Sequence, residues 1–417
     1  MPAPGETYQQ AGPTSPKPYI SYGLPFQEAA SWHVTNTFDV SRVYVVVSAT
    51  ISKTKDWAGL RDALGSKLVG VRYGIKPHTP WNEVYELAAD LQRVKPHVVI
   101  TLGGGSITDG VKLARLFAAN DVLTTEARLS FWEKAKPRFE KREDREDIAS
   151  ATNSCIFIPT SLSAGEWSQY GGATDDEGHK SLFQHKSMLA DIVIYDPALT
   201  LGLPEKFWFS TGVRTIDHCV EGLSSTNKVD DEDAIRDELD KALRRLLPNL
   251  LITKTKNYRD LDARLQCQLA TVILPRAITI GVAASHGIGH QLGPLGVGHG
   301  ETSCILLPNV LKFNWKHGDD LARQRQDRLR GIFWSDPVLR ALFQKRGLEE
   351  DKADAGDLLD AYLRELGMPR TLRGAGIKRE QFDSLAESSL RDPCTTNGPV
   401  KIGKAEVLEI LDMAWDD

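Results

Sequence analysis

The sequence predicts an α/β dinucleotide-binding domain followed by an all-helical domain. The chain of 417 residues is longer than a single hydrophobic core usually accommodates, so two domains are expected. Apolar β-branched runs alternate with helical patterns in the first half, which is typical of a doubly wound parallel sheet. Beyond Pro204 the hydrophobic spacing is helical throughout. We therefore predict a disordered tail over 1–17, an α/β domain over 18–203, for which the residues below indicate a nucleotide cofactor, and a helical domain over 204–417.

Composition excludes several classes of protein. Hydrophobic residues make up 41% of the chain and charged residues 26%, as in ordinary soluble globular proteins. No apolar run is long enough for a membrane helix and no signal segment opens the chain, so we expect a cytoplasmic protein. A net charge of −5, from 51 basic and 56 acidic residues, argues against a nucleic-acid partner. Five separated cysteines without a C-x-x-C pair indicate reduced, mostly buried thiols.

The first domain begins with recognisable sheet elements. Residues 1–17 are rich in Pro, Gly, Ser and Gln, which predicts disorder. The continuous apolar run within Arg42–Ser48 predicts a strand buried on both faces, and Lys67–Arg72 predicts a second strand. Apolar residues at helical spacing over Trp81–Val94, directly after Pro80, predict the helix between this strand and the next.

A glycine loop follows the next strand. The strand is expected over His97–Leu102 and the following helix through Val111–Phe117, with three consecutive glycines at 103–105 in between. Such a loop lets backbone N–H groups approach a phosphate, and the helix dipole favours the anion. A tight turn without a ligand is the alternative, although it needs fewer glycines. We predict a pyrophosphate site, displaced from the first strand, where the usual G-x-G-x-x-G loop would lie and Ser48 stands instead.

The rest of the first domain combines a surface segment with two strands. The dense mixed-charge run within 130–147 predicts a solvated helix or surface insertion. Strands are expected at Cys155–Ile158 and Leu189–Tyr195, and the latter closes the domain. Hydroxyl residues fill the turn over 159–166 at the end of the first of these strands. They suit hydrogen bonding to a nicotinamide or ribose, and simple turn chemistry explains them equally well.

Histidines gather in the second domain. Arg214 and His218 are four residues apart, as are His286 and His290, so on helices each pair projects from one face. His299 follows in a Gly-rich turn. A satisfied core histidine is the usual alternative for one such residue, but clustering favours function. We expect the cluster to face the carboxyl ends of the sheet across a cleft. Helices are expected at 230–247, 263–280, 301–315, 321–334, 358–366 and 405–415.

The order of motifs resembles the iron-type alcohol dehydrogenase family over nearly the whole chain. The shared motifs are G-G-G-S-x-x-D-x-x-K, P-T-S-x-S-A-G-E, T-G-x-x-x-x-x-H-x-x-E and H-G-x-x-H…H-G. The resemblance implies an α/β domain and a helical domain of the dehydroquinate synthase-like architecture, and hydride transfer between NAD(P) and a carbonyl or alcohol. It also implies cofactor contacts from Gly103, Gly104, Gly105, Ser106, Asp109, Thr160, Ser161, Ser163 and Lys180, the last aligned across a variable hairpin.

One departure from the family is informative. The resemblance implies that metal-dependent members carry an Asp where this chain has Arg214, and that this Asp joins the equivalents of His218, His286 and His299 around a divalent ion. A guanidinium cannot ligate a metal. At about 4 Å and an effective dielectric of about 20, it would repel each unit of cation charge by about 4 kcal/mol. We therefore predict no metal, and expect Asp217 to orient Arg214 instead of ligating.

The resulting prediction is a metal-independent reductase. The maleylacetate reductase branch of the family, which this chain resembles, works without a metal but usually has a neutral residue in place of Arg214. Arg214 is predicted to stabilise an oxyanion or enolate, or to bind a substrate carboxylate. His290 and His299 are the candidate proton donors, and His218 and His286 would shape the anion pocket. The competing hypotheses are a metal-dependent alcohol dehydrogenase with rearranged ligands, a dehydroquinate synthase-like lyase and a non-catalytic binding protein.

The residues after the first strand bear on the cofactor. An acidic residue there would bind the ribose 2′-hydroxyl and reject a 2′-phosphate. This chain has Ser48 and Ala49, with Lys53 and Lys55 just beyond. We predict that Ser48 contacts the cofactor and that NADPH is accepted as well as NADH. The partner is a small-molecule substrate, and the sequence leaves a monomer and a homodimer equally open.

Overall fold

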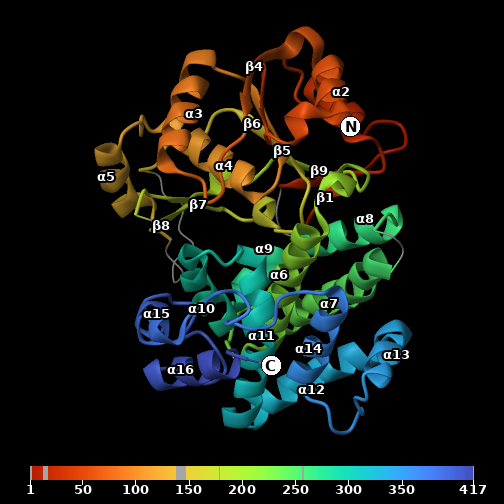
Figure 1. Ribbon diagram of the computed structural model, residues 1–417. Helices are drawn as coiled ribbons and strands as arrows, with labels where there is room; N and C mark the ends of the chain where they lie inside the picture. The colour runs from red at the N-terminus through yellow and green to blue at the C-terminus, as the bar shows by residue number, and fades with distance from the viewer. Residues whose placement is uncertain (1, 13–16, 138–146, 178, 256–257, 417) are drawn as a thin grey trace. The chain divides into compact units, whose positions relative to one another are not determined.

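The computed structural model describes residues 2–12, 17–137, 147–177, 179–255 and 258–416. Two compact units make up the chain, unit 1 over Met1–Gly202 and unit 2 over Leu203–Asp417. The division falls one residue before the predicted boundary at 203. Figure 1 shows the helices and strands of both units.

Unit 1 is an α/β domain in which most strands are parallel. Within the described residues, seven strands form one sheet in the order β1-β2-β9-β6-β5-β3-β4, where only the pair β1 and β2 is antiparallel. Its strands are β1 Thr7–Gln10, β2 Tyr19–Tyr22, β3 Val43–Val47, β4 Leu68–Tyr73, β5 Val98–Gly103, β6 Ser154–Pro159 and β9 Ile192–Tyr195. Its helices are α1 Phe26–Trp32, α2 Lys55–Leu64, α3 Trp81–Val94, α4 Gly105–Ala119 and α5 Thr125–Ala135. The α/β prediction for this half of the chain is confirmed.

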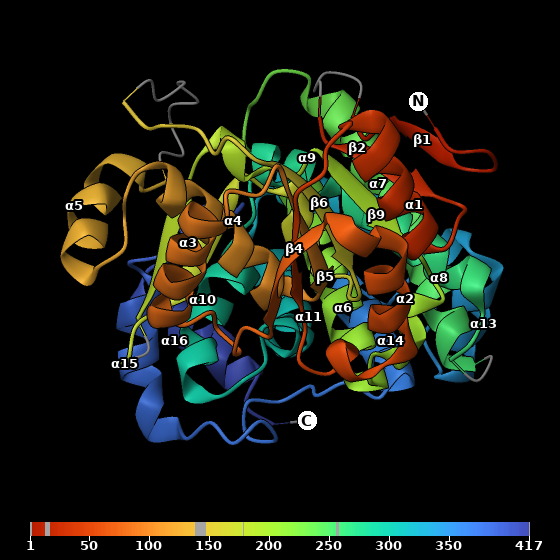
Figure 2. The same cartoon turned by 90° about the horizontal axis from the view of Figure 1, so that it is seen from above.

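Apolar residues on both faces hold the sheet between helices. All five residues of β3 are fully buried or nearly so. Alternate residues of the central strands share one core with α1 and α2, and α3 and α4 pack together on the opposite side of the sheet (Figure 2). Burial of both faces explains why the strands read as continuous β-branched runs. All five strands predicted for this domain are present, as β3, β4, β5, β6 and β9.

The predicted disorder of residues 1–17 is wrong for the first strand. Thr7–Gln10 forms β1 and pairs with β2, and Tyr8 stacks on Tyr19 at 4.7 Å. The side chain of Glu6 is fully buried and forms a hydrogen bond of 2.7 Å with the ring of His33, and it also accepts a hydrogen bond from Ser21. A polar, Pro-rich composition predicts disorder only if nothing anchors the segment, and here long-range contacts do so. Residues 13–16 lie outside the described part.

Glu6→Ala should lower the free energy of unfolding by about 3 kcal/mol, because removal of one partner from a buried pair leaves the other unsatisfied. The imidazole of His33 and the hydroxyl of Ser21 both lose their acceptor in this variant. Urea denaturation measures the loss. Glu133→Ala is the matched control, since Glu133 pairs with Lys136 at the surface and should cost less than about 1 kcal/mol. Equal effects of the two substitutions would contradict an anchoring role for Glu6.

Two further segments of unit 1 were predicted incompletely. Helix α5 covers the start of the charged run predicted over 130–147, and residues 138–146 of that run lie outside the described part. The variable hairpin implied by the resemblance is a two-stranded antiparallel pair, β7 Tyr170–Thr174 with β8 Lys180–Gln184, and its strands were not predicted from the residue pattern. Gly171 and Gly172 weaken the strand pattern there, because glycine is disfavoured in strands. The hairpin matters because it carries Lys180.

Unit 2 is helical. Its helices are α6 Glu205–Ser224, α7 Glu232–Thr255, α8 Leu261–Ala270, α9 Leu274–Ile280, α10 Ala284–Leu292, α11 His299–His317, α12 Asp320–Ser335, α13 Pro337–Lys345, α14 Ala355–Leu366, α15 Phe382–Ser389 and α16 Lys404–Met413. Helix α11 packs against α6, α10 and α14 (Figure 1). The five cysteines are free, as predicted, and all but Cys394 are buried.

Two expectations for unit 2 need correction. The single helix expected over 263–280 is broken into α8 and α9 by a 3-10 turn at Thr271–Ile273. Pro275 explains the break, because proline has no N–H to continue the hydrogen-bond ladder and is favoured in the first turn of the next helix. His299 does not lie in a turn but begins α11, directly after Gly298.

No single helix in the described residues combines the length and apolarity needed to cross a membrane. One sharply bent pair, Leu261–Ile280 with Ala284–Leu295, meets those criteria taken together.

Candidate active site

The residues predicted to bind a cofactor lie at the carboxyl edge of the sheet in unit 1. Ser48 follows β3, Gly103 ends β5 and Thr160 follows β6. Backbone hydrogen bonds join these three ends, from Ser48 N to Leu102 O (2.9 Å) and from Thr160 N to Gly103 O (3.2 Å). A Cβ on Gly103 would lie 2.9 Å from Ile107 and 3.2 Å from Ser48, so glycine is required here for close packing.

Two serines border the glycine loop. Ser161 and Ser163 lie 3.1 Å apart through their hydroxyl oxygens. A Cβ on Gly105 would lie 3.4 Å from the hydroxyl of Ser163, and one on Gly104 would lie 3.8 Å from that of Ser161. Helix α4 begins at Gly105 without a side-chain cap and without an acidic residue in its first turn. Uncapped N–H groups at the start of a long helix, beside two hydroxyls, form a site that suits a pyrophosphate.

Lys180 reaches this region from the β7–β8 hairpin. Its ammonium lies 4.0 Å from the carboxylate of Asp109, one turn into α4. Ser106, between the glycines and Asp109, accepts a hydrogen bond from the hydroxyl of Thr79 through its carbonyl (3.4 Å). The structure therefore gathers the residues predicted to contact the cofactor, although those contacts remain a prediction.

Lys112 is a structural residue that the sequence analysis missed. It lies on α4, is fully buried, and donates hydrogen bonds to the carbonyls of Gly165, Ser168 (2.7 Å) and Tyr170 (3.0 Å). Burial lowers the pKa of Lys112 to about 8. Because its three N–H groups hold the segment after the serine turn, Lys112 fastens that turn to the helix that carries the glycine loop. Its place in the G-G-G-S-x-x-D-x-x-K motif was the available signal.

The second set of residues lies in unit 2 and begins on helix α6. Arg214, Asp217, His218 and Glu221 follow one another at spacings of three, one and three residues, which places them along one side of the helix. Helix α6 is buried along most of its length, so this side faces other helices and not solvent. These buried polar residues therefore need hydrogen-bond partners on this or the neighbouring helices.

Four histidines form a cluster, which we call the histidine cluster (His218, His286, His290 and His299). The ring centroid of His286 lies 5.1 Å from that of His218, 4.9 Å from that of His290 and 6.4 Å from that of His299. His290 and His299 stack at 5.7 Å with an angle of 8° between their planes. The predicted gathering of these histidines is thus present in the structure, where they come from α6, α10 and α11.

Arg214 lies inside this assembly with 2% of its side chain exposed. Its Nη1 donates hydrogen bonds to Asp217 Oδ2 (3.1 Å) and to Ser303 Oγ (2.9 Å). Ser303 in turn donates to the same Asp217 oxygen (2.6 Å). The predicted pairing of Asp217 with Arg214 is confirmed. The Nε and Nη2 atoms of Arg214 are buried and have no hydrogen-bond partner among the described residues, so two donor positions stay available.

Burial sets the charge of two of the histidines. It lowers the pKa of His218 and His286 well below the usual histidine value, and the charge of Arg214 lowers both further. Each therefore carries a neutral ring at neutral pH. Nδ1 of each ring is buried and has no hydrogen-bond partner among the described residues. The interior of the cluster thus holds a guanidinium beside neutral imidazoles.

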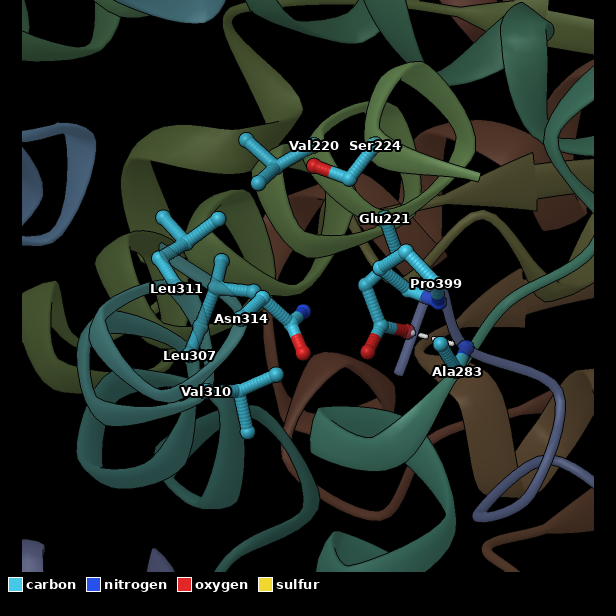
Figure 3. Close-up of a pocket in the computed structure, with 9 residues that line it drawn as sticks. All are labelled: Val220, Glu221, Ser224, Ala283, Leu307, Val310, Leu311, Asn314 and Pro399. Atoms are coloured by element: carbon cyan, nitrogen blue, oxygen red, sulfur yellow. Dashed lines mark hydrogen bonds between the residues drawn. The ribbon is translucent and has the colours of Figure 1, made fainter. Parts of the chain in front are cut away.

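Glu221 connects α6 to the start of α10. One of its oxygens accepts a hydrogen bond from Ala283 N (2.7 Å, Figure 3) and the other accepts one from Ser285 N (2.8 Å). These bonds cap α10, which has no side-chain cap of its own, and orient the helix that bears His286 and His290. Burial, and then the nearby Asp217, raise the pKa of Glu221 well above its usual value.

A small cavity of about 10 Å³ adjoins Glu221. A cavity of this volume holds about one water molecule. Figure 3 shows its lining: Val220, Glu221, Ser224, Ala283, Leu307, Val310, Leu311, Asn314 and Pro399. The cavity is too small for a substrate, so it is a feature of the packing around Glu221.

The donor groups present fit a divalent metal poorly. The predicted fallback set of His218, His286 and His299 includes no carboxylate and has Arg214 beside it. Asp217, Glu221 and His286 do place ligand atoms within 4.8 Å of one another. However, Asp217 Oδ2 is already bound to Arg214 and Ser303, and both oxygens of Glu221 accept backbone N–H groups. Asp217 Oδ1 has no hydrogen-bond partner among the described residues, but a metal there would still share the engaged oxygens of Glu221 and lie close to the buried guanidinium of Arg214.

Comparison with known proteins adds sequence evidence. Residues 26–197 match the family model described as iron-containing alcohol dehydrogenase, and residues 208–415 match the C-terminal model of the same family. The chain is 44% identical to dehydrogenase FUM7 of Gibberella moniliformis over 98% of both chains. It is 45% identical to dehydrogenase ALT3 of Alternaria alternata over 90% of this chain and 99% of that protein.

Solved structures share the fold at lower identity. Sulfoacetaldehyde reductase from Bifidobacterium kashiwanohense, in complex with NAD⁺, superposes with a TM-score of 0.76 at 21% identity, over 99% of this chain and all of that chain. Maleylacetate reductase from Rhizobium sp. strain MTP-10005 gives 0.72 at 21% identity, over 98% of this chain and 97% of that chain. With both halves matched by its models and two relatives above 40% identity, the chain belongs to the iron-containing alcohol dehydrogenase family and is an oxidoreductase.

Proposed function

We propose that this oxidoreductase uses NAD(P)H to reduce a carbonyl or a conjugated enoate or keto acid, and that it does so without a metal. The observation that carries the proposal is the position of Arg214. Its guanidinium lies buried among the histidines, where metal-dependent relatives are expected to have a carboxylate ligand. The two oxygens of Glu221 and one oxygen of Asp217 are already engaged, which further supports a reaction without an ion.

The residues of unit 1 fit a nicotinamide cofactor. The uncapped start of α4 would hold the pyrophosphate, with Gly103, Gly104, Gly105 and Ser106 leaving room for its oxygens. Ser48, Asp109, Thr160, Ser161, Ser163 and Lys180 would contact the ribose and nicotinamide parts. When bound, the reduced nicotinamide supplies the hydride that reduces the substrate.

The hydrogen bonds of Arg214 indicate how it would act in the reaction. Asp217 balances its charge, so Arg214 acts chiefly through its available N–H groups and not through net charge. Nε and Nη2 can donate to an oxygen that becomes negative as the substrate is reduced, or to a substrate carboxylate. A low-dielectric site strengthens these hydrogen bonds, and burial of Arg214 provides one.

The histidines divide into two groups under this proposal. His218 and His286 are neutral and line the site of the oxygen, because burial and Arg214 disfavour their charged forms. His290 and His299 lie farther from the interior and stack on each other, and one of them gives the substrate its proton. The net reaction is the addition of one hydride and one proton across a double bond.

A substrate panel tests the proposal. Oxidation of NADPH and NADH should be followed with aldehydes, keto acids and enoic diacids. Turnover that persists after chelation supports the metal-independent reductase. Turnover that is lost on chelation and restored by Zn²⁺ or Fe²⁺ supports the alternative, a metal-dependent alcohol dehydrogenase with rearranged ligands. Absence of net redox turnover with every compound supports a lyase or a binding protein.

The cofactor prediction concerns the turn after β3. Ser48 and the exposed Ala49 stand where an acidic residue would reject a 2′-phosphate. NADPH should therefore bind at least as tightly as NADH in a fluorescence titration. Ala49→Asp should weaken NADPH binding by about tenfold and change NADH binding little, since only NADPH carries the repelled phosphate. Much tighter binding of NADH by the unaltered protein would contradict the prediction.

A further inference from the structure

Asp392 contacts the histidine cluster from a distant part of the chain. Its Oδ2 lies 2.7 Å from Nδ1 of His290, and 102 residues separate the two in sequence. The other oxygen, Oδ1, accepts a hydrogen bond from Cys394 N (2.9 Å). Both carboxylate oxygens are thus used as acceptors, one by a ring nitrogen and one by the backbone of its own turn.

The turn that carries Asp392 is fastened to α10. A Cβ on Gly287 would lie 2.2 Å from the hydroxyl and 2.5 Å from the backbone nitrogen of Thr395, so only glycine permits this close approach. Asn397 donates to the carbonyl of Val282 (3.1 Å), just before α10 begins. These contacts hold the turn against the helix that bears His290. The distance between Asp392 and the ring is therefore set by packing on both sides.

A carboxylate can only accept hydrogen bonds, and this fixes the histidine. Burial tends to raise the pKa of Asp392, but hydrogen bonds from His290 and Cys394 hold it below its usual value. The ring nitrogen that faces a carboxylate must carry the hydrogen, so Nδ1 of His290 is the protonated nitrogen of the neutral ring. When the ring takes up a second proton at Nε2, that is the proton it can give to a substrate.

We propose that Asp392 is a positioning residue for catalysis, which fixes the orientation and the tautomer of His290 so that Nε2 delivers the proton. This inference rests on the proposed reductase function and assigns the proton donor between His290 and His299. In the reduction, His290 starts as the imidazolium beside the Asp392 carboxylate. The hydride goes to the substrate carbon, the Nε2 proton goes to the substrate oxygen, and the ring is left as the neutral Nδ1–H tautomer. The Nδ1 hydrogen stays on the bond to Asp392, and solvent returns the proton to Nε2, since 29% of the His290 side chain is exposed.

Asp392→Asn tests the tautomer directly. An amide offers one acceptor where the carboxylate offers two, so Asn cannot satisfy both Cys394 N and His290 Nδ1–H. If its oxygen stays on Cys394 N, its NH₂ group donates to Nδ1 and forces the hydrogen onto Nε2. We expect kcat to fall by about 100-fold. KM and cofactor affinity should change less than about threefold, because Asp392 binds neither ligand.

Two measurements separate positioning from general damage. In ¹⁵N NMR of labelled histidine, His290 should change from the Nδ1–H to the Nε2–H tautomer in Asp392→Asn, whether or not any substrate is known. In a double-mutant cycle, Asp392→Asn should add little to the loss caused by His290→Ala, since the two residues act as one unit. Asp383→Asn is the matched control, because this residue of α15 is exposed, pairs with Lys404 at the surface and should leave kcat unchanged.

Several outcomes would overturn the inference. These are kcat within threefold of the unaltered enzyme in Asp392→Asn, an unchanged tautomer, or additive losses in the cycle. If Asp392→Asn does not fold, Asp392→Glu can be used, because a glutamate keeps both acceptor oxygens. His290 should then retain the Nδ1–H tautomer, and kcat should be intermediate. An Nε2–H tautomer of His290 in Asp392→Glu would also refute the inference. If the unaltered protein reduces no compound in the panel, the proposed reductase function is wrong. The NMR measurement still shows whether Asp392 sets the tautomer of His290, because it needs no substrate.

Discussion

Arg214→Ala should lower kcat by about 100- to 1000-fold, the usual loss when a donor to a developing oxyanion is removed. Cofactor affinity should stay nearly unchanged, because the predicted cofactor contacts lie in unit 1. The substitution also leaves Asp217 as a buried carboxylate without its partner, which should cost about 3–5 kcal/mol of stability. Steady-state kinetics and urea denaturation measure the two effects separately.

Companion variants keep these effects apart. Arg214→Ala combined with Asp217→Asn removes the unpaired charge, so it should recover stability without recovering kcat. Arg214→Lys keeps the charge but loses the planar fork of donors, and should restore little activity. Arg276→Ala is the matched control, since Arg276 pairs with Glu238 near the surface and should leave kcat within about twofold. Full activity in Arg214→Ala would remove the proposed role of this residue.

The second large effect concerns metal binding. Protein purified without chelators should contain well below one equivalent of metal and keep its activity after chelation. Arg214→Asp should bind about one equivalent of Zn²⁺ or Fe²⁺, because it replaces a guanidinium, which cannot ligate a metal, with a carboxylate beside three imidazoles. Metal analysis of the two proteins measures the gain. Arg276→Asp is the control for a carboxylate introduced elsewhere in unit 2.

The opposite result has a distinct signature. Stoichiometric metal in the unaltered protein, with turnover abolished by its removal, would contradict the metal-independent reaction. The ligand set is then decided by Glu221→Gln. This variant should release the ion if Asp217, Glu221 and His286 hold it, and should leave it bound if the three histidines His218, His286 and His299 do.

Much of unit 1 could be predicted because its signals are local. A strand buried on both faces must be apolar at every position, so β3 and β5 are readable from composition alone. The glycine loop is likewise visible, since the packing of Gly103 against Ile107 and Ser48 tolerates no side chain. β1 was missed because its stability depends on Glu6 reaching His33, a contact that no local pattern encodes.

In unit 2, helical spacing allowed us to predict which side chains of the candidate site lie on the same side of a helix. Arg214 and His218 share a helix, as do His286 and His290, and a period of 3.6 residues places each pair on one side. Their convergence with His299 was expected and is present. The break between α8 and α9 was missed because apolar residues continue at helical spacing across it, although Pro275 marks the start of a new helix.

By itself the sequence determined the family, the order of the elements and the identity of the side chains that meet, because these depend on local composition and spacing. Only the tertiary structure decided what each of those side chains bonds to. Asp217 neutralises Arg214, Glu221 caps α10, and Asp392 orients His290 across 102 residues. Hydrogen bonds of this kind join groups that are close only after packing, and their geometry has no counterpart in the linear order of residues.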